Sequence, residues 1–268
     1  MGKQLIAVLM SLLLVSVILS GCLSEDGNSE DSLDENQDEL PPYQEDGIYT
    51  CIDHDNISRC WQTHIPDSLP INSPIPLIID LHGFGSDSTE HRKLSDFNTI
   101  ADEYGAIVVY PDGLITQNSW DTEANQGWNA GWCCADPAIN DVDDVGFIEQ
   151  IVEIAILKHN IDSTRIYLSG WSNGCAMAQR MAMDSSHIFA AMGCMSFYLV
   201  SDENSNYSPI PIMEVHGFLD QIVLYESSIL SVPFNQGSWT DPEAIETGAI
   251  ENMYEWGEYN GCSGDLNT

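Results

Sequence analysis

The sequence predicts one α/β domain, residues 47–268, in which helices cover both faces of a mostly parallel central sheet. Three observations predict this fold. From Pro76 onward, short and nearly continuous apolar runs alternate with amphipathic segments, as buried parallel strands alternate with helices. No internal repeat or second linker interrupts the alternation. Hydrophobic residues make up 43% of the 268 residues, which is enough to fill a sizeable core.

An export signal is predicted before this domain. Lys3 is followed by an apolar run over residues 5–19 that is too short to cross a hydrocarbon core of about 30 Å, so we assign residues 1–21 to a signal peptide. The small residues before Cys22 resemble a lipobox, which implies cleavage there and lipidation of the Cys22 thiol. An ordinary signal peptide cut nearby is the alternative. Either form places the domain outside the cytoplasm, lipid-anchored to a membrane or secreted.

Acidic residues dominate the chain, most densely in residues 22–46. Ten of the 24 residues from 23 to 46 are Asp or Glu and none is basic, so this segment is interpreted as a solvated, disordered tether. The whole chain has 42 acidic and 7 basic residues, a formal charge of −35. Nucleic acid and anionic membrane surfaces are therefore poor partners, because phosphate groups must be met by clustered cations and the chain has none.

The elements of the domain follow from the apolar runs and their period. The predicted strands, in chain order, are residues 77–81, 106–110, 165–169, 190–195 and 212–215. Helices are predicted over residues 88–104, 144–159 and 242–259; in the second, apolar residues recur at i, i+3 and i+4. Right-handed crossovers between these strands give a doubly wound sheet.

A candidate nucleophile follows the third predicted strand. Gly170-x-Ser172-x-Gly174 stands directly after this strand and directly before a predicted helix. The glycines allow a tight turn that lifts the Ser172 hydroxyl clear of the sheet, and the turn places the N–H of Asn173 at a helix N-terminus. An ordinary turn serine is the bland alternative, but the strand–turn–helix context favours a nucleophile.

Two further strand ends carry candidate site residues. The first strand ends in His82-Gly83-Phe84, where the N–H of Phe84 is our candidate for the second donor of an oxyanion hole. We interpret His82 as a brace for this loop rather than a proton carrier. The last strand is followed by Asp220, which suits the orienting acid in the chain order Ser, Asp, His. A surface loop aspartate is the alternative in a chain this acidic.

Taken in order, several motifs resemble the polyhydroxybutyrate depolymerase and feruloyl esterase-like branch of the α/β-hydrolases over residues 58–262. These motifs are Pro-Leu-Ile-Ile-Asp-Leu-His-Gly at 76–83, Val-Tyr-Pro-Asp-Gly at 109–113, Trp128-Asn129 with Cys133-Cys134, Asp-Asp-Val-Gly-Phe at 143–147, Gly-Trp-Ser-Asn-Gly at 170–174 and His-Gly-x-x-Asp at 216–220. The resemblance implies a serine esterase with Ser172 as nucleophile and Asp220 as acid. It implies substrates among feruloyl or acetyl esters on polysaccharide, hydroxyalkanoate polyesters and small aryl esters.

The catalytic histidine of that family is missing from its expected place. It lies in a Gly-Gly-His-like stretch after the acid, whereas none of the 48 residues after Asp220 is His and the last histidine is His216. Removal of one triad member typically costs several powers of ten in rate. Two interpretations compete: the chain is truncated before this histidine, or the fold has lost catalysis and kept binding.

The cysteines favour truncation. If Cys22 is lipidated, seven remain, an odd number for an oxidising compartment. Cys51 and Cys60 are close enough in sequence to bridge a short loop, and the next four cysteines can pair among themselves, which leaves Cys262 alone. In the resembled family the cysteine of an Asn-Gly-Cys stretch, here Cys262, is expected to have a partner further downstream.

We therefore expect an exported esterase that works through an acyl-enzyme on Ser172 and needs no cofactor or metal. Trp171 and Trp128 are candidates for lining a pocket that holds an acyl group or a sugar ring. A surface lipoprotein that binds glycan or polyester without catalysis is the rival hypothesis. A peptidase is a weaker one, because hydrolases of that kind usually carry a large additional domain that this chain has no room for.

Overall fold

The structure is a computed structural model that describes residues 43–46, 49–69, 73–116, 125–226 and 248–263. The predicted signal peptide, Cys22 and nearly all of the predicted tether lie outside the described residues. Within the described ranges, no helix combines the length and the apolar character needed to cross a bilayer.

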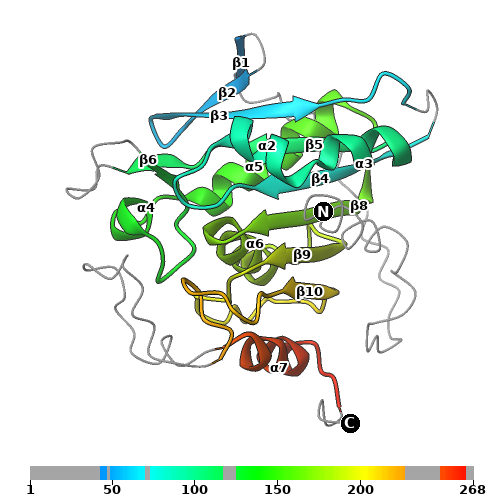
Figure 1. The fold of residues 1–268 in the computed structure, drawn as a ribbon. Coiled ribbons are helices and arrows are strands. Elements are labelled where there is room, and N and C mark those ends of the chain that lie inside the picture. The colour runs from blue at the N-terminus through cyan, green and yellow to red at the C-terminus, as the bar shows by residue number, and fades with distance from the viewer. Residues whose placement is uncertain (1–42, 47–48, 70–72, 117–124, 227–247, 264–268) are drawn as a thin grey trace.

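A twisted sheet of eight strands forms the centre of the described chain, in the order β1-β2-β3-β5-β4-β8-β9-β10 (Figure 1). Its strands are β1 Tyr43–Asp46, β2 Tyr49–His54, β3 Ile57–His64, β4 Ile75–Leu81, β5 Ile107–Pro111, β8 Ile161–Trp171, β9 Ala191–Met195 and β10 Ile212–Val215. The strands from β5 to β10 pair in parallel, whereas β1, β2 and β3 extend the sheet as antiparallel strands beyond β5. A separate two-stranded ribbon joins β6 (Leu114–Thr116) to β7 (Asn125–Gly127).

Helices pack on both faces of the sheet, as the sequence predicts. They are α2 Ser88–Ser95, α3 Phe97–Tyr104, α4 Ala135–Ile139, α5 Asp144–Lys158, α6 Asn173–Asp184 and α7 Ala249–Tyr259. Because side chains alternate along a strand, Ile78 of β4 packs with α3 residues such as Phe97, while its neighbours Leu77 and Ile79 join the larger core beside α5 and α6. The α/β-hydrolase architecture is confirmed.

The predicted strands coincide with β4, β5, β8, β9 and β10, and residues 144–159 with α5, but three expectations needed correction. The predicted helix over residues 88–104 is two helices, because Asp96 adopts a left-handed conformation with φ 57° between α2 and α3. The helix predicted over residues 242–259 begins at Ala249, and residues 242–247 lie outside the described ranges. The end of the predicted tether, Tyr43–Asp46, pairs with β2 as an edge strand.

Among the seven cysteines that the structure describes, three disulfides pair six. Cys51–Cys60 joins β2 to β3 at positions that face each other in the ladder, as their short separation suggests. Cys133–Cys134 links neighbours, and Cys175–Cys194 ties α6 to β9. Cys262 is exposed just after α7. The Cys175–Cys194 disulfide is anchored in the first turn of α6, three residues after Ser172.

Candidate active site

Ser172 stands at a sharp turn between β8 and α6. Its backbone has φ 54° and ψ −125°, a conformation that residues other than glycine rarely adopt. The turn is held on both sides: the Ser172 N–H donates to the Met195 carbonyl at 2.8 Å, and the Ser172 carbonyl accepts from the N–H of Cys175 and Ala176. A strained serine at a strand-to-helix turn is the geometry of a hydrolase nucleophile.

Three glycines make this turn possible by letting backbones approach closely. A Cβ added at Gly170 would collide with the backbone of Gly174, and one added at Gly174 would collide with the carbonyl groups at the end of β4. A Cβ added at Gly83 would lie 3.4 Å from the Ser172 Cβ. The loop after β4 is therefore in contact with Ser172, as an oxyanion loop must be.

The two proposed oxyanion donors belong to these two backbone segments. Asn173 is the first residue of α6, so its N–H lies at the positive end of the helix dipole. Phe84 directly follows Gly83 in the loop that contacts Ser172, and its partly buried ring packs against the main core. Both residues thus stand on the two segments that meet at Ser172. Their role as donors to a substrate oxyanion remains a prediction.

Trp128 is buried behind the loop after β4 and does not line an accessible surface. Its assignment as a substrate-binding candidate is therefore corrected to a supporting role. Its side chain is 0% exposed, and its indole N–H donates to the His82 carbonyl at 2.9 Å. The Asn173 side chain holds the Trp128 backbone at both ends: Oδ1 accepts from the Trp128 N–H at 2.8 Å and Nδ2 donates to its carbonyl at 3.2 Å. These bonds lock the first residue of α6 to the loop after β4.

His82 is the brace that the sequence suggests. The ring is completely buried, and its Nε2 accepts from the Gly113 N–H at 2.9 Å, so Nδ1 carries the proton and donates to the Gly83 carbonyl at 2.8 Å. Burial lowers the pKa of His82 to about 4. The ring is therefore neutral at pH 7, with both nitrogens occupied within the scaffold.

Asp220 lies in the loop that follows β10. Its Oδ1 accepts from the N–H groups of Ile222 and Val223 at 2.9 and 3.0 Å, which fixes the carboxylate against its own loop. Its Oδ2 lies 3.9 Å from Nε2 of His216. Two other parallel strand ends, those of β4 and β8, carry Gly83 and Ser172, so the sheet brings all three segments to one edge.

No histidine is placed to take a proton from Ser172. All seven histidines of the sequence lie within the described ranges, and no ring nitrogen among them hydrogen-bonds to the Ser172 hydroxyl. His91 pairs with the buried Asp80 at 3.1 Å. His216 is buried with both ring nitrogens engaged by Glu214 and Val223. The sequence lacks a histidine after Asp220, and the fold brings none of the earlier histidines into a hydrogen bond with Ser172.

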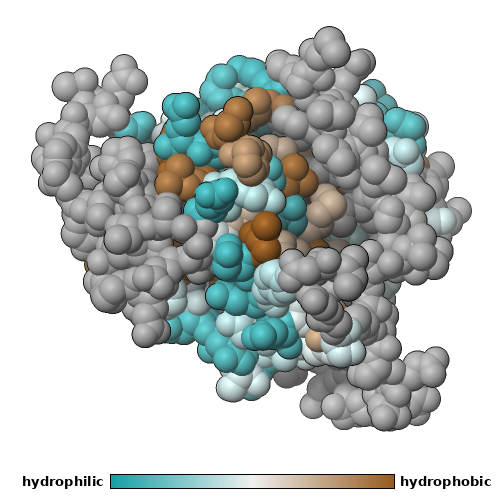
Figure 2. Space-filling model, turned by 60° about the horizontal axis from the view of Figure 1, so that its bottom comes forward, coloured by the Kyte–Doolittle hydropathy of each residue, from teal (hydrophilic) through white to brown (hydrophobic). Residues whose placement is uncertain are grey.

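Trp171, beside the nucleophile, is the accessible one of the two tryptophan candidates. It is 40% exposed and lines a cavity of about 110 Å³ between the end of α2 and the ends of β8 and β9. The loop that carries Asp220 also exposes Phe218, Leu219 and Ile222. Figure 2 shows apolar residues among polar ones on the described part of one face of the molecule.

The described residues bring one set of potential metal ligands together, away from the Ser172 turn in the fold. Ligand atoms of His54, Asp55 and Asp143 lie within 4.8 Å of one another, at the turn after β2 and the start of α5. His54 is already engaged within the protein, because Nε2 lies 3.1 Å from Asp143 Oδ2 and Nδ1 lies 3.1 Å from Gln150 Oε1. This cluster contributes nothing to the candidate active site.

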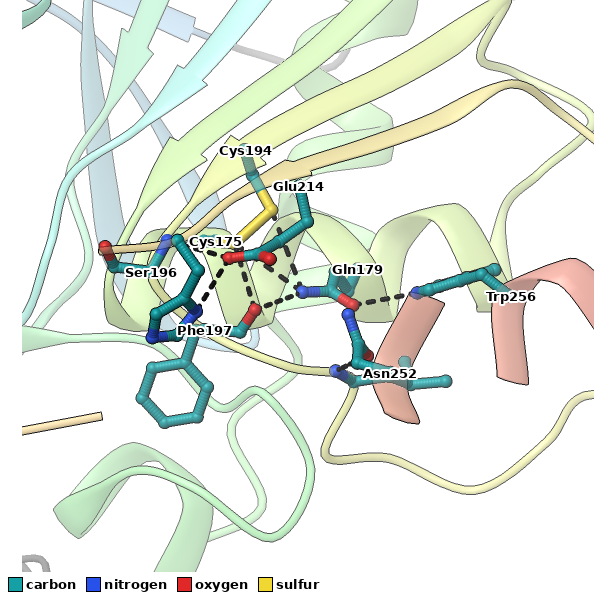
Figure 3. The surroundings of a disulfide bond; sticks show 10 residues. Cys175, Gln179, Cys194, Ser196, Phe197, Glu214, Asn252 and Trp256 are labelled. Atoms are coloured by element: carbon teal, nitrogen blue, oxygen red, sulfur yellow. Dashed lines mark hydrogen bonds and ion pairs between the residues drawn. A yellow bond between two sulfur atoms is a disulfide. The ribbon is translucent and has the colours of Figure 1, made fainter. Parts of the chain in front are cut away.

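Residues that sequence reasoning missed hold the nucleophile turn in place. Figure 3 shows Gln179 of α6 beside the Cys175–Cys194 disulfide, with its amide directed toward Phe197 and Trp256. Nε2 of Gln179 donates to the Phe197 carbonyl at 2.7 Å, and its Oε1 accepts from the Trp256 indole at 2.8 Å. A buried glutamine on a helix of small and sulfur-containing residues is the signal that could have indicated this network.

Comparison with known families agrees with this geometry. The model of the family described as Esterase PHB depolymerase matches residues 54–238, more than half of the chain. The chain belongs to this family of PHB depolymerase esterases. The matched range contains Ser172, Asp220 and the loop after β4.

Several relatives in the wider group are named esterases. A bifunctional acetylxylan esterase/xylanase of Neocallimastix patriciarum is 28% identical over 63% of this chain, and feruloyl esterase B of Piromyces equi is 27% identical over 75%. The chain spans only 22% and 35% of the lengths of these two proteins. Probable feruloyl esterase C of Aspergillus niger is 25% identical and is covered over 73% of its length.

Solved structures share the fold of this chain. Acetyl xylan esterase from Aspergillus awamori superposes with a TM-score of 0.52 at 19% identity, over 76% of this chain and 75% of that one. A thermostable esterase gives the same TM-score at 15% identity, over 83% of this chain and 52% of that one. At these identities the likeness supports the fold alone.

Proposed function

We propose that this protein is a serine esterase of carboxylic esters that works through an acyl-enzyme on Ser172. One observation carries the proposal: the strained backbone of Ser172, between β8 and α6, with the Gly83 loop packed against it. The combination of φ 54° and ψ −125° on a serine between a strand and a helix is a strained conformation of the kind that clusters at active sites. Membership of the PHB depolymerase esterase family supports the same activity.

The mechanism follows from the position of each group. The Ser172 oxygen attacks the ester carbonyl carbon, and the N–H groups of Asn173 and Phe84 donate to the oxyanion that forms. The tetrahedral intermediate collapses, the alcohol leaves with a proton, and water then attacks the acyl-enzyme to release the acid. Asp220 is placed to orient a base, but no described histidine bonds to Ser172, so in residues 1–268 the Ser172 proton passes to water and the leaving alcohol takes its proton from water. None of these steps uses a metal or cofactor.

Ester groups on polysaccharide or in a hydroxyalkanoate polyester are the proposed substrates. Three of the relatives are named for acetylxylan or feruloyl esterase activity, and the family is named for a polyester depolymerase. Trp171 and the apolar residues of the Asp220 loop offer an accessible surface for an aromatic or apolar acyl group.

The missing base favours a second candidate function, binding without turnover. Because no described histidine bonds to Ser172, the accessible surface beside Ser172 can hold a glycan or polyester without cleaving it. The two functions differ in whether an oxyanion hole is needed beside residue 172. A binding protein needs no oxyanion hole there, whereas an esterase needs one even when its base is absent.

A thiol at position 172 separates these functions, because thiolate is a strong nucleophile without an adjacent base. At the N-terminus of α6 the new thiol of Ser172→Cys should have a lowered pKa. We expect p-nitrophenyl acetate to acylate it at least about tenfold faster than the new thiol of Ser208→Cys, an exposed control position. Peptide mapping distinguishes both sites from Cys262. Equal acylation rates at the two positions would rule out an oxyanion hole at Ser172.

We further propose that the domain is exported and held at a membrane by a lipid on Cys22, with ester substrates outside the cell. The apolar run over residues 5–19 and the small residues before Cys22 support this localisation. Cys22→Ala should release the protein from the membrane fraction or leave it unprocessed, as followed by fractionation and intact mass. A wild-type protein found soluble with residues 1–21 still attached would refute it.

A further inference from the structure

A buried ion pair lies directly below the loop that carries Asp220. Glu214 is the third residue of β10, His216 follows the strand, and their side chains are 2% and 1% exposed. His216 Nδ1 lies 2.9 Å from Glu214 Oε1, and its Nε2 lies 2.7 Å from the Val223 carbonyl oxygen. Figure 3 shows Glu214 next to Ser196, whose N–H donates to the same carboxylate oxygen at 3.2 Å.

The hydrogen-bond partners determine how many protons this ring carries. A carbonyl oxygen can only accept, and an ionised carboxylate can only accept, so each ring nitrogen must supply its own proton. His216 bonded in this way to an ionised Glu214 is an imidazolium. The Ser196 N–H is shared between the Val215 carbonyl at 3.0 Å and Oε1 of Glu214 at 3.2 Å, so the Glu214 carboxyl accepts at this contact as well.

The groups packed around His216 favour the charged ring. Tyr198 stacks on it at 5.3 Å and 12°, and Tyr225 meets it edge-on at 6.0 Å. Glu214 and Asp220 are the acidic side chains that face it, the latter at 3.9 Å. Burial alone lowers the pKa of His216, but the hydrogen bonds to Glu214 and Val223 outweigh burial and raise it above the usual value.

We propose that His216 is a positioning residue for the catalytic acid: as an imidazolium it ties the end of β10 to Val223 and so closes the loop that holds Asp220. The role rests on the assignment of Asp220 in the proposed function. The closed loop is the one in which Asp220 Oδ1 accepts from the N–H groups of Ile222 and Val223. His216 cannot also be the base, because both of its nitrogens are occupied.

Long-range ¹H–¹⁵N spectra of the histidine rings test the protonation state directly. At pH 7 we expect both nitrogens of His216 to be protonated, with the second proton lost only above the usual histidine pKa of about 6.5. Glu214→Gln removes the ionic partner and should make the ring neutral at pH 7. Glu149→Gln is the control, because it removes a glutamate that contacts Ser185 instead. A single protonated nitrogen in the wild type at pH 7 would overturn the proposal.

Amide hydrogen exchange tests whether this charge positions the loop. In Glu214→Gln, protection of the Ile222 and Val223 amides should fall about tenfold, and in the wild type it should fall with the same pH midpoint as the loss of the second His216 proton. A merely structural imidazole would show no such midpoint, and protection independent of the His216 charge overturns the role. Neither measurement needs ester turnover, so failure of the esterase proposal in the thiol test remains separately visible.

Discussion

The neutral, buried His82 braces the oxyanion loop through both of its ring nitrogens. It donates to the Gly83 carbonyl and accepts from Gly113, and its indole neighbour Trp128 is bonded to the His82 carbonyl. The His-Gly pair at a strand end was enough to predict a brace. The partners could not be predicted, because Gly113 and Trp128 are 31 and 46 residues away in the sequence.

Protonation of His82 at acid pH should destabilise the folded protein. Because the pKa of His82 is lowered to about 4 in the folded state, its contribution to stability is fully present above pH 6.5 and is lost as the pH falls toward 4. We expect up to roughly 3 kcal/mol of the free energy of unfolding to disappear over this range. Urea titrations at several pH values measure it. His82→Gln should flatten this part of the profile, whereas a wild-type profile in His82→Gln, or the same change in the exposed control His187→Gln, would contradict the assignment.

At the scale of elements, buried strands and amphipathic helices were predictable and breaks within them were not. Strand β10 has the bounds that its apolar run predicts, and α5 ends one residue earlier than predicted. The break between α2 and α3 carries no glycine or proline, and Asp96 is compatible with a continuous helix by composition. The antiparallel strands β1 to β3 were missed because their polar residues mask the alternation.

The left-handed conformation of Asp96 predicts which of two substitutions there, glycine or alanine, gives the more stable protein. In a continuous helix glycine is about 1 kcal/mol less stable than alanine, but in the left-handed conformation this order is reversed. Asp96→Gly should therefore be more stable than Asp96→Ala by about 1 kcal/mol in thermal or urea unfolding. The exposed helical Thr99 is the matched control, where alanine should be more stable than glycine. Alanine more stable than glycine at position 96 would mean that the helix is continuous.

For the whole molecule, the sheet brings three strand ends together although their residues are far apart in the sequence. The segments around Gly83, Ser172 and Asp220 follow β4, β8 and β10, and all three strands belong to one parallel set. Motif order was sufficient to predict this convergence and the family. The partners of the supporting residues, including those of Gln179, Glu214 and Cys175, depend on packing between β9, β10 and α6 and could not be predicted from local sequence.

The absence of a placed base among the described histidines implies that residues 1–268 hydrolyse esters several powers of ten more slowly than a complete triad. Small-molecule rescue tests the central claim most directly. Added imidazole can take the place of the base, so the rate on methyl ferulate, corrected for imidazole alone, should rise with imidazole concentration in the wild type and reach saturation. Ser172→Ala should abolish the rise, and Asp220→Asn should weaken it. An equal imidazole-dependent rate in the wild type and in Ser172→Ala would contradict the account.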